Sequence, residues 1–399
     1  MRRIAVLGAS GLAGTAVCEH LVSRGRDEVV PFVRSSGNAW RLARRGIRPR
    51  LVDCRDRGET VRALRDCSHV VNCVLGDGEA MTRGLRNILG GAVRHRVEGF
   101  VHLSSVAVFG EPPPPEAATE HVPRRRPPRG TYGRMKLEQD RVVRRAARSG
   151  LPVVILCPPN IGGPYSHFFT RLTRALGAGT LPLVGEGAHR CNLVDTRNLA
   201  QAVELALDHG SREAPFYFIT DAEGMPWSRL LASLGRLAPD RTPARISIEA
   251  ARAILDEAEP EPRSFVRSLT HLGSSEVRAA LRRDPLWADV DALVRKGIRR
   301  MGRGVERRLQ PVFTDSSGNG APLSVGSGNG RSDGSPQYSA PLIRQQLRTV
   351  VHSCGKAKRD LGYAPEISSE CSVDAFVRRC RVESGMDSEM GELLGVLQA

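Results

Sequence analysis

Lysine is scarce in this chain of 399 residues, because only four of its 59 basic residues are lysine and the others are arginine. A net charge of +16 would attract nucleic acid or an acidic membrane if it were gathered on one face. The arginines are instead spread along the whole length, as codon bias in a GC-rich genome would produce. Aromatic residues, at 5%, are sparse for a surface that stacks bases. The composition therefore argues against a nucleic-acid partner.

Paired cysteines and long apolar runs are also missing. The nine cysteines lie singly, with no CxxC pair and no histidine cluster at metal-ligand spacing. No stretch reaches the roughly 18 apolar residues that a membrane span requires. The start, MRRIAVLGASGLAG, resembles a signal peptide only superficially, because glycines interrupt its apolar run. We expect a reduced, cytoplasmic protein with no metal site and no membrane span.

Short β-rich runs alternate with amphipathic helical patterns over the first 160 residues. The predicted strands are 3–7, 28–33, 49–52, 70–74, 99–103 and 153–156, and the predicted helices are 12–23, 39–45, 60–65, 81–93 and 131–149. The strands are nearly continuously apolar, which is typical of a parallel sheet covered by helices on both faces. The sequence therefore predicts a doubly wound α/β domain.

The composition changes further along the chain. Residues 110–130 are rich in Pro and Arg and are predicted as a loop, and helical patterns dominate after about residue 221. Before that point, Asp195 or Thr196 could cap a helix, and 216–220 reads as one more strand. Residues 315–337 are rich in Gly and Ser and cannot bury enough apolar surface to order themselves.

The stretch GASGLAG places Gly8, Gly11 and Gly14 between the first strand and its helix. A doubly wound sheet binds a dinucleotide there, because the helix N-terminus presents free N–H groups and the positive end of its dipole to the pyrophosphate. Glycine triplets are weak indicators in isolation, but this location makes them much stronger. The alternative is a glycine-rich turn that binds no cofactor.

The second strand ends in Arg34 and Ser35 instead of the Asp or Glu that usually holds the adenosine ribose of NAD. A guanidinium suits a 2′-phosphate, which a carboxylate would repel. NADP(H) is therefore favoured; NAD(H) stays open, since Arg34 could equally be a solvated surface arginine. Asp53 closes the third strand, where it could touch the adenine edge or only cap the next turn.

Tyr132 and Lys136 stand one helical turn apart, so both side chains leave the same face of the predicted helix. Ser104 and Ser105 end the preceding strand, at the carboxyl edge of the sheet, where ligands lie in open α/β folds. We predict Tyr132 as the acid/base, Lys136 as the ammonium that lowers its pKa, and Ser105 as the group that orients the substrate oxygen. The alternative is an exposed polar pair on an ordinary helix.

Together these motifs resemble the extended short-chain dehydrogenase/reductase family, the NAD-dependent epimerase/dehydratase group. The resemblance rests on GASGLAG, RNILGGAVRHRVEGFVHLSSVAVFG, YGRMK, CPPNIGGP, NLVDTRNLAQAVELAL and KAKRDLGYAP, which follow family order. It implies that Tyr132 is the catalytic acid/base, Lys136 its partner and Ser105 the third member. Further cofactor contacts are expected from Ser10, Leu12, Cys73, Val74, Asn87, Leu103 and Pro158.

The resemblance also implies a doubly wound parallel Rossmann sheet with a smaller, mainly helical C-terminal substrate-binding lobe, in a family that commonly forms homodimers. We expect the dinucleotide domain at 1–160 and 191–220, the lobe at 161–190, 221–313 and 340–399, and a flexible linker or loop at 314–339. The resemblance says nothing about residues from about 240 to 340. The candidate contacts to a small-molecule substrate are Ser104, Asn160, Tyr165, His167 and Arg190.

Three functions stay open. An NADP(H)-dependent ketone reductase or alcohol dehydrogenase comes first, because the Arg34 ending resembles reductases of the dihydroflavonol and 3β-hydroxysteroid dehydrogenase type. A nucleotide-sugar epimerase or dehydratase that retains NAD comes second; it needs cations such as Arg190 for the substrate pyrophosphate. A non-catalytic dinucleotide-binding regulator or scaffold comes third, with the basic segment 295–308 contacting membrane or RNA. The presence of all three catalytic residues argues against this third function.

Overall fold

The computed structural model describes residues 1–120, 131–258 and 337–382. The chain divides into two compact units, one of Met1–Leu255 with Pro336–Ala399 and the other of Asp256–Ser335. The elements described below belong to the first unit, except that helix α9, Ile248–Ala258, extends beyond Leu255. The basic segment 295–308 and residues 314–336 of the predicted linker lie outside the described residues.

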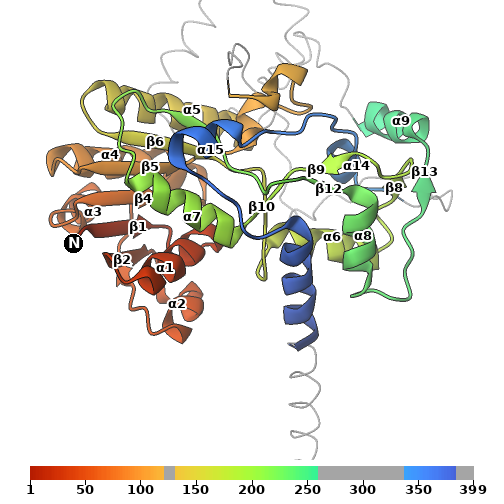
Figure 1. The fold of residues 1–399 in the computed structure, drawn as a ribbon, viewed down its shortest axis with the longest axis horizontal. Helices are drawn as coiled ribbons and strands as arrows, with labels where there is room; N and C mark the ends of the chain where they lie inside the picture. Colours follow the sequence, from red (N-terminus) through yellow and green to blue (C-terminus); the bar gives the residue numbers. More distant parts are fainter. Residues whose placement is uncertain (121–130, 259–336, 383–399) are drawn as a thin grey trace, which may run out of the picture. The chain divides into compact units, whose positions relative to one another are not determined.

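Seven parallel strands form one sheet in the order β3-β2-β1-β4-β5-β6-β11 (Figure 1). Their bounds are β1 Arg3–Leu7, β2 Glu28–Val33, β3 Arg50–Leu51, β4 His69–Asn72, β5 Gly99–Leu103, β6 Val153–Cys157 and β11 Phe216–Phe218. The chain winds outward from β1 to β3 and then returns to pair β4 with β1. The winding therefore reverses between the carboxyl ends of β1 and β4, where ligands bind in such sheets. The predicted doubly wound sheet is confirmed.

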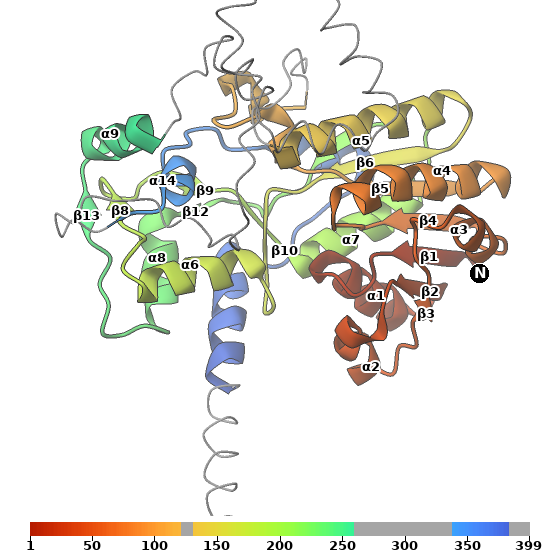
Figure 2. The same ribbon diagram turned by 180° about the vertical axis from the view of Figure 1, so that it is seen from behind.

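Helices cover both faces of the sheet (Figures 1 and 2). Along β1, Ile4 and Val6 join the core formed with α1 and α7, whereas Ala5 and Leu7 join the core formed with α3, α4 and α5. All four side chains are at most 2% exposed, which explains why the strands read as unbroken apolar runs. The helices around the sheet are α1 Leu12–Arg24, α2 Trp40–Arg44, α3 Arg57–Ala63, α4 Leu85–Arg94, α5 Thr131–Arg148, α7 Thr196–Leu207 and α15 Gly355–Leu361. A π-helical turn, Ala80–Gly84, leads into α4, and 3-10 turns lie at Ser36–Asn38, Val106–Phe109 and Pro115–Ala118.

In the described residues, a smaller lobe contains α6, α8, α9 and α14, a further helix over residues 369–382, and three short strand pairs. Phe168 and Phe169 of α6 pack with Trp227 of α8 and with Phe376 to form its apolar core. The labelled helices are α6 His167–Gly177, α8 Trp227–Gly235, α9 Ile248–Ala258 and α14 Ala340–Gln346. The pairs are β7 Asn160–Gly162 with β10 Leu193–Asp195, β8 Leu183–Val184 with β13 Arg245–Ile246, and β9 Arg190–Cys191 with β12 Met225–Pro226. Helix α6 and the short strands were not predicted from the sequence. For this part of the chain, the sequence indicated only a strand and helix pattern around β10 and α7.

Side-chain caps fix where several helices begin. Asp56 accepts a hydrogen bond from Glu59 N at the start of α3, and Ser166 does the same for Phe169 N at α6. At α7 the cap is Asp195, which accepts from Arg197 N at 2.8 Å. Of the two residues that the sequence offered for this cap, Asp195 is therefore the correct one.

Side chains form hydrogen bonds with the outward-facing backbone groups of the edge strand β11. The Phe218 N–H donates to the carboxylate of Glu120 at 2.9 Å, and the Phe216 carbonyl accepts from Lys356 Nζ at 2.9 Å. Occupied backbone groups on an edge strand cannot pair with another chain. Because Lys356 lies on α15, the same contacts attach the C-terminal segment to the sheet.

The turn from β1 into α1 lies so close to β4 that it depends on glycine. Gly8 has φ +77°, and a Cβ added there would lie 2.8 Å from the Cys73 carbonyl. A Cβ on Gly14, in the first turns of α1, would collide with the carbonyl oxygen of Gly8. At Gly8 the turn therefore lies so close to the end of β4 that no residue with a side chain fits there.

We predict that Gly14→Ala lowers the free energy of unfolding by about 1–3 kcal/mol, because the added methyl has no space beside the Gly8 carbonyl. Gly90→Ala in α4 is the matched control, since a Cβ at Gly90 meets nothing within 4 Å. That control should be stabilised by about 0.5–1 kcal/mol, the usual gain from replacing glycine inside a helix. Urea unfolding of both variants measures the difference, and equal stabilities would show that the turn is not packed as described.

Candidate functional site

A crevice of about 830 Å³ opens at the carboxyl ends of β1, β2, β3 and β4, at the point where the winding reverses. Its volume lies in the range of cofactor pockets. Many of the predicted cofactor residues line it, namely Gly8, Ser10, Gly11, Leu12, Arg34, Ser35, Asp53, Cys73 and Val74. Gly14 does not line the crevice and instead lets α1 approach Gly8.

The glycine turn directs the N-terminus of α1 into this crevice. Gly11 is the N-cap of α1 with extended backbone, and its N–H donates to the Gly8 carbonyl at 3.0 Å. The first turn of α1 contains no acidic residue that would repel an anion. Because N–H groups in the first turn of a helix lack intrahelical acceptors, this loop fits the pyrophosphate of a dinucleotide.

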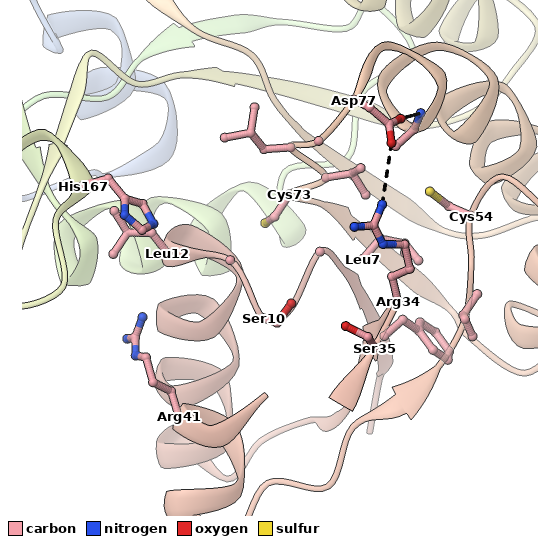
Figure 3. Close-up of a pocket in the computed structure, with 18 of the residues that line it drawn as sticks. Leu7, Ser10, Leu12, Arg34, Ser35, Arg41, Cys54, Cys73, Asp77 and His167 are labelled. Atoms are coloured by element: carbon pink, nitrogen blue, oxygen red, sulfur yellow. Dashed lines mark hydrogen bonds and ion pairs between the residues drawn. The ribbon is translucent and has the colours of Figure 1, made fainter. Parts of the chain in front are cut away.

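Arg34 and Ser35 lie at the end of the crevice that follows β2. Figure 3 shows Arg34 reaching across toward Asp77, and the nearest nitrogen and oxygen atoms are 3.7 Å apart. The Arg34 side chain remains 60% exposed, so its guanidinium can still meet a second anion. A 2′-phosphate near Ser35 would lie within the field of this cation.

Asp53 lines the crevice, but its carboxylate is paired with the guanidinium of Arg55. Arg55 donates to both of its carboxylate oxygens, at distances of 2.6 to 3.0 Å, and this pairing lowers the pKa of Asp53. Asn87, expected to contact the cofactor, is not among the residues that line the crevice. Its side-chain amide donates to the carbonyls of Cys54 and Arg55, so Asn87 fixes the loop after β3.

The opposite end of the crevice is lined by Tyr165 and His167, two of the candidate substrate residues. In Figure 3, His167 and Arg41 lie on the far side of the α1 N-terminus from Arg34 and Cys54. The guanidinium of Arg41 lies 4.0 Å from the centre of the Tyr165 ring, and that of Arg379 lies 4.7 Å from it. These cation–π contacts fix the ring of Tyr165 at the boundary between the sheet and the lobe.

Tyr132 lies close to Ser105 at the carboxyl end of β5. Ser105 caps the 3-10 turn after β5 and accepts from Ala107 N at 3.3 Å, and it lies close enough to the Tyr132 hydroxyl to lower the pKa of the phenol. The Tyr132 side chain remains 39% exposed. Burial raises the pKa of the Tyr132 phenol, and Ser105 partly opposes that rise.

Lys136, one helical turn after Tyr132 on α5, is only 4% exposed. Its Nζ donates to the Leu103 carbonyl at 2.9 Å, at the end of β5. Burial lowers the pKa of Lys136 to about 8, against the opposing effect of Asp140. We expected a lowered pKa for Tyr132, but its net shift is upward, because burial is the largest effect and Lys136 is not among the groups that change it. Lys136 is also close enough to Cys73, on the wall of the crevice, to influence its titration.

The remaining candidates lie in three different settings. Ser104 is buried, and its hydroxyl has no hydrogen-bond partner within the described residues. The Pro158 carbonyl accepts from Val106 N and fixes the loop beside Ser105. Asn160 donates to the Asn192 carbonyl and fixes a loop within the lobe.

Arg190 lines a separate cavity of about 380 Å³, donates to the Gly224 carbonyl and pairs with Glu223. The structure does not bring Arg190 to the crevice.

Several residues that line the crevice escaped the sequence analysis. Asp77 follows β4 in a turn, and a strand-end acidic residue was a usable signal that we did not weigh. Trp40, Arg41, Thr170 and Arg379 come from distant segments, and no local pattern marks them. Within the described ranges, no group of three or more His, Cys, Asp or Glu could hold a metal ion, and no helix is both long and apolar enough for a membrane span.

Two curated relatives have different reactions in their names. A dTDP-glucose 4,6-dehydratase from Neisseria meningitidis serogroup B is 30% identical over 223 residues, which is 47% of this chain and 62% of the dehydratase. The match thus spans less than two thirds of that enzyme's length. A 4-hydroxy-2-methyl-3-oxo-4-farnesyl-3,4-dihydroquinoline-1-oxide ketoreductase from Stigmatella aurantiaca is 24% identical over 388 residues, covering 94% of this chain and 95% of the ketoreductase.

Solved structures agree with the fold. The dTDP-glucose 4,6-dehydratase of Streptomyces venezuelae, solved with NAD bound, has a TM-score of 0.61 at 21% identity and covers 96% of this chain and 98% of its own. A nucleoside-diphosphate-sugar epimerase from Pseudomonas aeruginosa has a TM-score of 0.60 at 18% identity, with 96% and 98% covered. At these identities the likeness shows the fold alone.

The sequence also matches the model of the NAD dependent epimerase/dehydratase family over residues 4–217. This range is more than half of the chain and contains the glycine turn, the loops of the crevice and the Ser105, Tyr132 and Lys136 group. The chain therefore belongs to the NAD-dependent epimerase/dehydratase family and is an NAD(P)-dependent enzyme.

Proposed function

We propose that the chain is an NADP(H)-dependent oxidoreductase that interconverts a ketone and a secondary alcohol on a small molecule. The observation that carries this proposal is the grouping of Tyr132, Ser105 and Lys136 at the end of β5, next to a crevice whose β2 end presents Arg34 and Ser35. The ketoreductase relative supports the same class of reaction, because it matches over nearly the full length of both chains.

A bound nicotinamide supplies the hydride to the carbonyl carbon, or accepts it in the reverse direction. Tyr132 gives its phenolic proton to the substrate oxygen as negative charge develops there. Ser105, which lies close to the Tyr132 hydroxyl, is placed to hold the same oxygen and stabilise that charge. One hydride and one proton convert a ketone into an alcohol, so the electrons and atoms balance.

The protonation states of the site suit the reductive direction. A raised pKa keeps the Tyr132 phenol protonated at neutral pH, so it is ready to act as an acid. Lys136, with a pKa of about 8, carries its charge below that pH and stabilises the phenolate left after proton transfer. Oxidation of the alcohol needs the phenolate from the start and should therefore be favoured at higher pH.

The preference for NADP(H) is supported by the charges around the end of β2. Arg34 is an exposed cation that lines the crevice, next to Ser35. The acidic residue nearest to it, Asp77, comes from the loop after β4, and Asp53 is neutralised by Arg55. The strand end itself therefore offers no carboxylate to hold the ribose hydroxyls of NAD.

A nucleotide-sugar dehydratase or epimerase is the second candidate, favoured by the 30% identity to the Neisseria enzyme. Such an enzyme must neutralise the pyrophosphate of its substrate. Arg190, the cation that the sequence offered for this role, lies in another cavity and is paired with Glu223. We therefore place this candidate behind the ketone reductase, and a non-catalytic scaffold behind both.

Replacing Tyr132 with Phe removes the proton donor while keeping the ring. We predict that Tyr132→Phe lowers kcat for NADPH-dependent ketone reduction by about 10²- to 10⁴-fold, the usual contribution of general acid–base catalysis. The measurement is the loss of NADPH absorbance with a panel of ketones that includes quinolone-type substrates. Tyr338→Phe, at a tyrosine packed in the lobe, is the matched control and should retain activity.

Two results would contradict the reductase assignment. Full activity in Tyr132→Phe would mean that the phenol is not the acid. Conversion of a nucleotide sugar without net oxidation of NADPH, in an enzyme that purifies with NAD, would favour the epimerase or dehydratase reaction.

Arg34→Asp tests the cofactor preference. We predict that the ratio of kcat/KM for NADPH to that for NADH falls by about 10- to 100-fold, because a carboxylate repels the 2′-phosphate and can hold the ribose hydroxyls of NADH. Arg45→Asp is the control, since Arg45 is an exposed arginine that does not line the crevice. An unchanged ratio in Arg34→Asp would refute the role assigned to Arg34.

A further inference from the structure

A row of buried polar side chains, which the proposed reaction does not use, lies beneath Lys136. His102 on β5 and Asp140 on α5 are both fully buried, and His102 Nε2 is 3.8 Å from Asp140 Oδ1. Asn72 on β4 lies directly opposite His102 in the sheet, and its amide nitrogen is 3.0 Å from His102 Nδ1. Burying these groups costs stability, because each must exchange water for a protein partner.

The contacts of Asn72 determine which nitrogen of His102 carries the proton. The Val74 N–H donates to Asn72 Oδ1 at 3.3 Å, so the amide group of Asn72 is the end that faces His102. An amide NH₂ can only donate, and His102 Nδ1 must therefore be the acceptor. The proton of the neutral imidazole then lies on Nε2, which faces Asp140.

This arrangement connects the cofactor crevice to Lys136. Val74 lines the crevice and fixes Asn72, Asn72 fixes the tautomer of His102, and His102 presents an N–H toward the carboxylate of Asp140. Asp140 lies one turn after Lys136 on the same face of α5. The Lys136 ammonium in turn donates to the Leu103 carbonyl, on the residue after His102.

We propose that Asn72, His102 and Asp140 form a positioning network that keeps Asp140 ionised and thereby keeps Lys136 protonated next to Tyr132. The proposal rests on the proposed function only for its catalytic meaning, because the network itself is defined by the buried contacts. His102 and Asp140 are positioning residues, since they act through Lys136 and do not touch the substrate.

The charged and titratable groups around Lys136 come from four elements. Asp140 on α5 favours the ammonium, whereas burial disfavours it; Cys73 after β4 and Cys157 on β6 have weaker effects in the same direction as Asp140. His102 on β5 has a pKa far below its usual range because it is fully buried, so it stays neutral and adds no charge. Of these groups, Asp140 has the largest effect in favour of the charged lysine.

The scarcity of lysine makes a direct test practical. The full chain, labelled with ¹³C at lysine Cε, contains only four labelled residues, and Lys136→Arg identifies the signal of Lys136. We expect this signal to titrate near pH 8 in the natural chain. In Asp140→Asn the midpoint should fall by about one pH unit or more, as expected when a buried opposite charge is removed.

His102→Phe provides a second variant, which decides the question should Asp140→Asn fail to fold. His102→Phe removes the Nε2–H that faces Asp140 at 3.8 Å. The carboxylate of Asp140 then becomes less favourable, so the midpoint of Lys136 should move in the same direction by a smaller amount. His69→Phe is the matched control, because His69 is also buried but lies at the start of β4, away from this network. Its Lys136 midpoint should be unchanged.

An unchanged Lys136 midpoint in a folded Asp140→Asn protein would overturn the proposal, and so would equal shifts in His102→Phe and His69→Phe. The titration needs neither substrate nor turnover. A reductase assay that fails while the midpoint moves as expected would therefore overturn the proposed function and leave the network standing.

Discussion

The burial of one ammonium group, that of Lys136, is the constraint on which the site depends. A charge removed from water costs several kcal/mol unless partners replace the lost hydration. Here the Leu103 carbonyl accepts a hydrogen bond from it, and Asp140 supplies the opposing charge. These partners require β5 and α5 to pack at one fixed register, and the same packing brings Ser105 to Tyr132. Burial also moves the two pKa values in opposite directions, lowering that of Lys136 and raising that of Tyr132. At neutral pH the pair therefore consists of a charged lysine and a neutral phenol.

Much of the central sheet could be predicted from the sequence, because its strands are buried on both faces and its helices on one. The predicted strands 3–7, 28–33 and 99–103 have the bounds that the structure shows. The strand pairs of the lobe could not be predicted, since strands of two or three residues have no periodicity and exist only through tertiary hydrogen bonds. Helix α6 did have an apolar pattern, with Phe168, Phe169, Leu172 and Leu176 on one buried face. From the sequence, this segment was assigned only the candidate substrate contacts Tyr165 and His167, and no helix was predicted there.

The site was predictable where residue identity alone decides the chemistry, and not where burial decides it. The glycine turn, the strand-end serine and the Tyr132–Lys136 spacing all pointed to groups that the structure brings to one edge of the sheet. The direction of the Tyr132 pKa shift was not predictable, because spacing gives the neighbours of a group but not its access to water. Arg41 and Arg379 meet at Tyr165 from opposite ends of the chain, a contact that only the fold creates.

In the proposed function, the group around Tyr132 supplies the acid–base chemistry, while the lobe and the charges at the end of β2 select the substrate and the cofactor. The central claim is that the Tyr132 hydroxyl and the nicotinamide meet across one reacting carbon. A crystal structure of the chain with NADPH tests this claim most directly. The account predicts the pyrophosphate on the glycine turn, the 2′-phosphate beside Arg34, and the nicotinamide C4 facing the Tyr132 hydroxyl with space for one carbonyl group between them. A nucleotide bound elsewhere, or a Tyr132 hydroxyl turned to bulk water away from the nicotinamide, would contradict it.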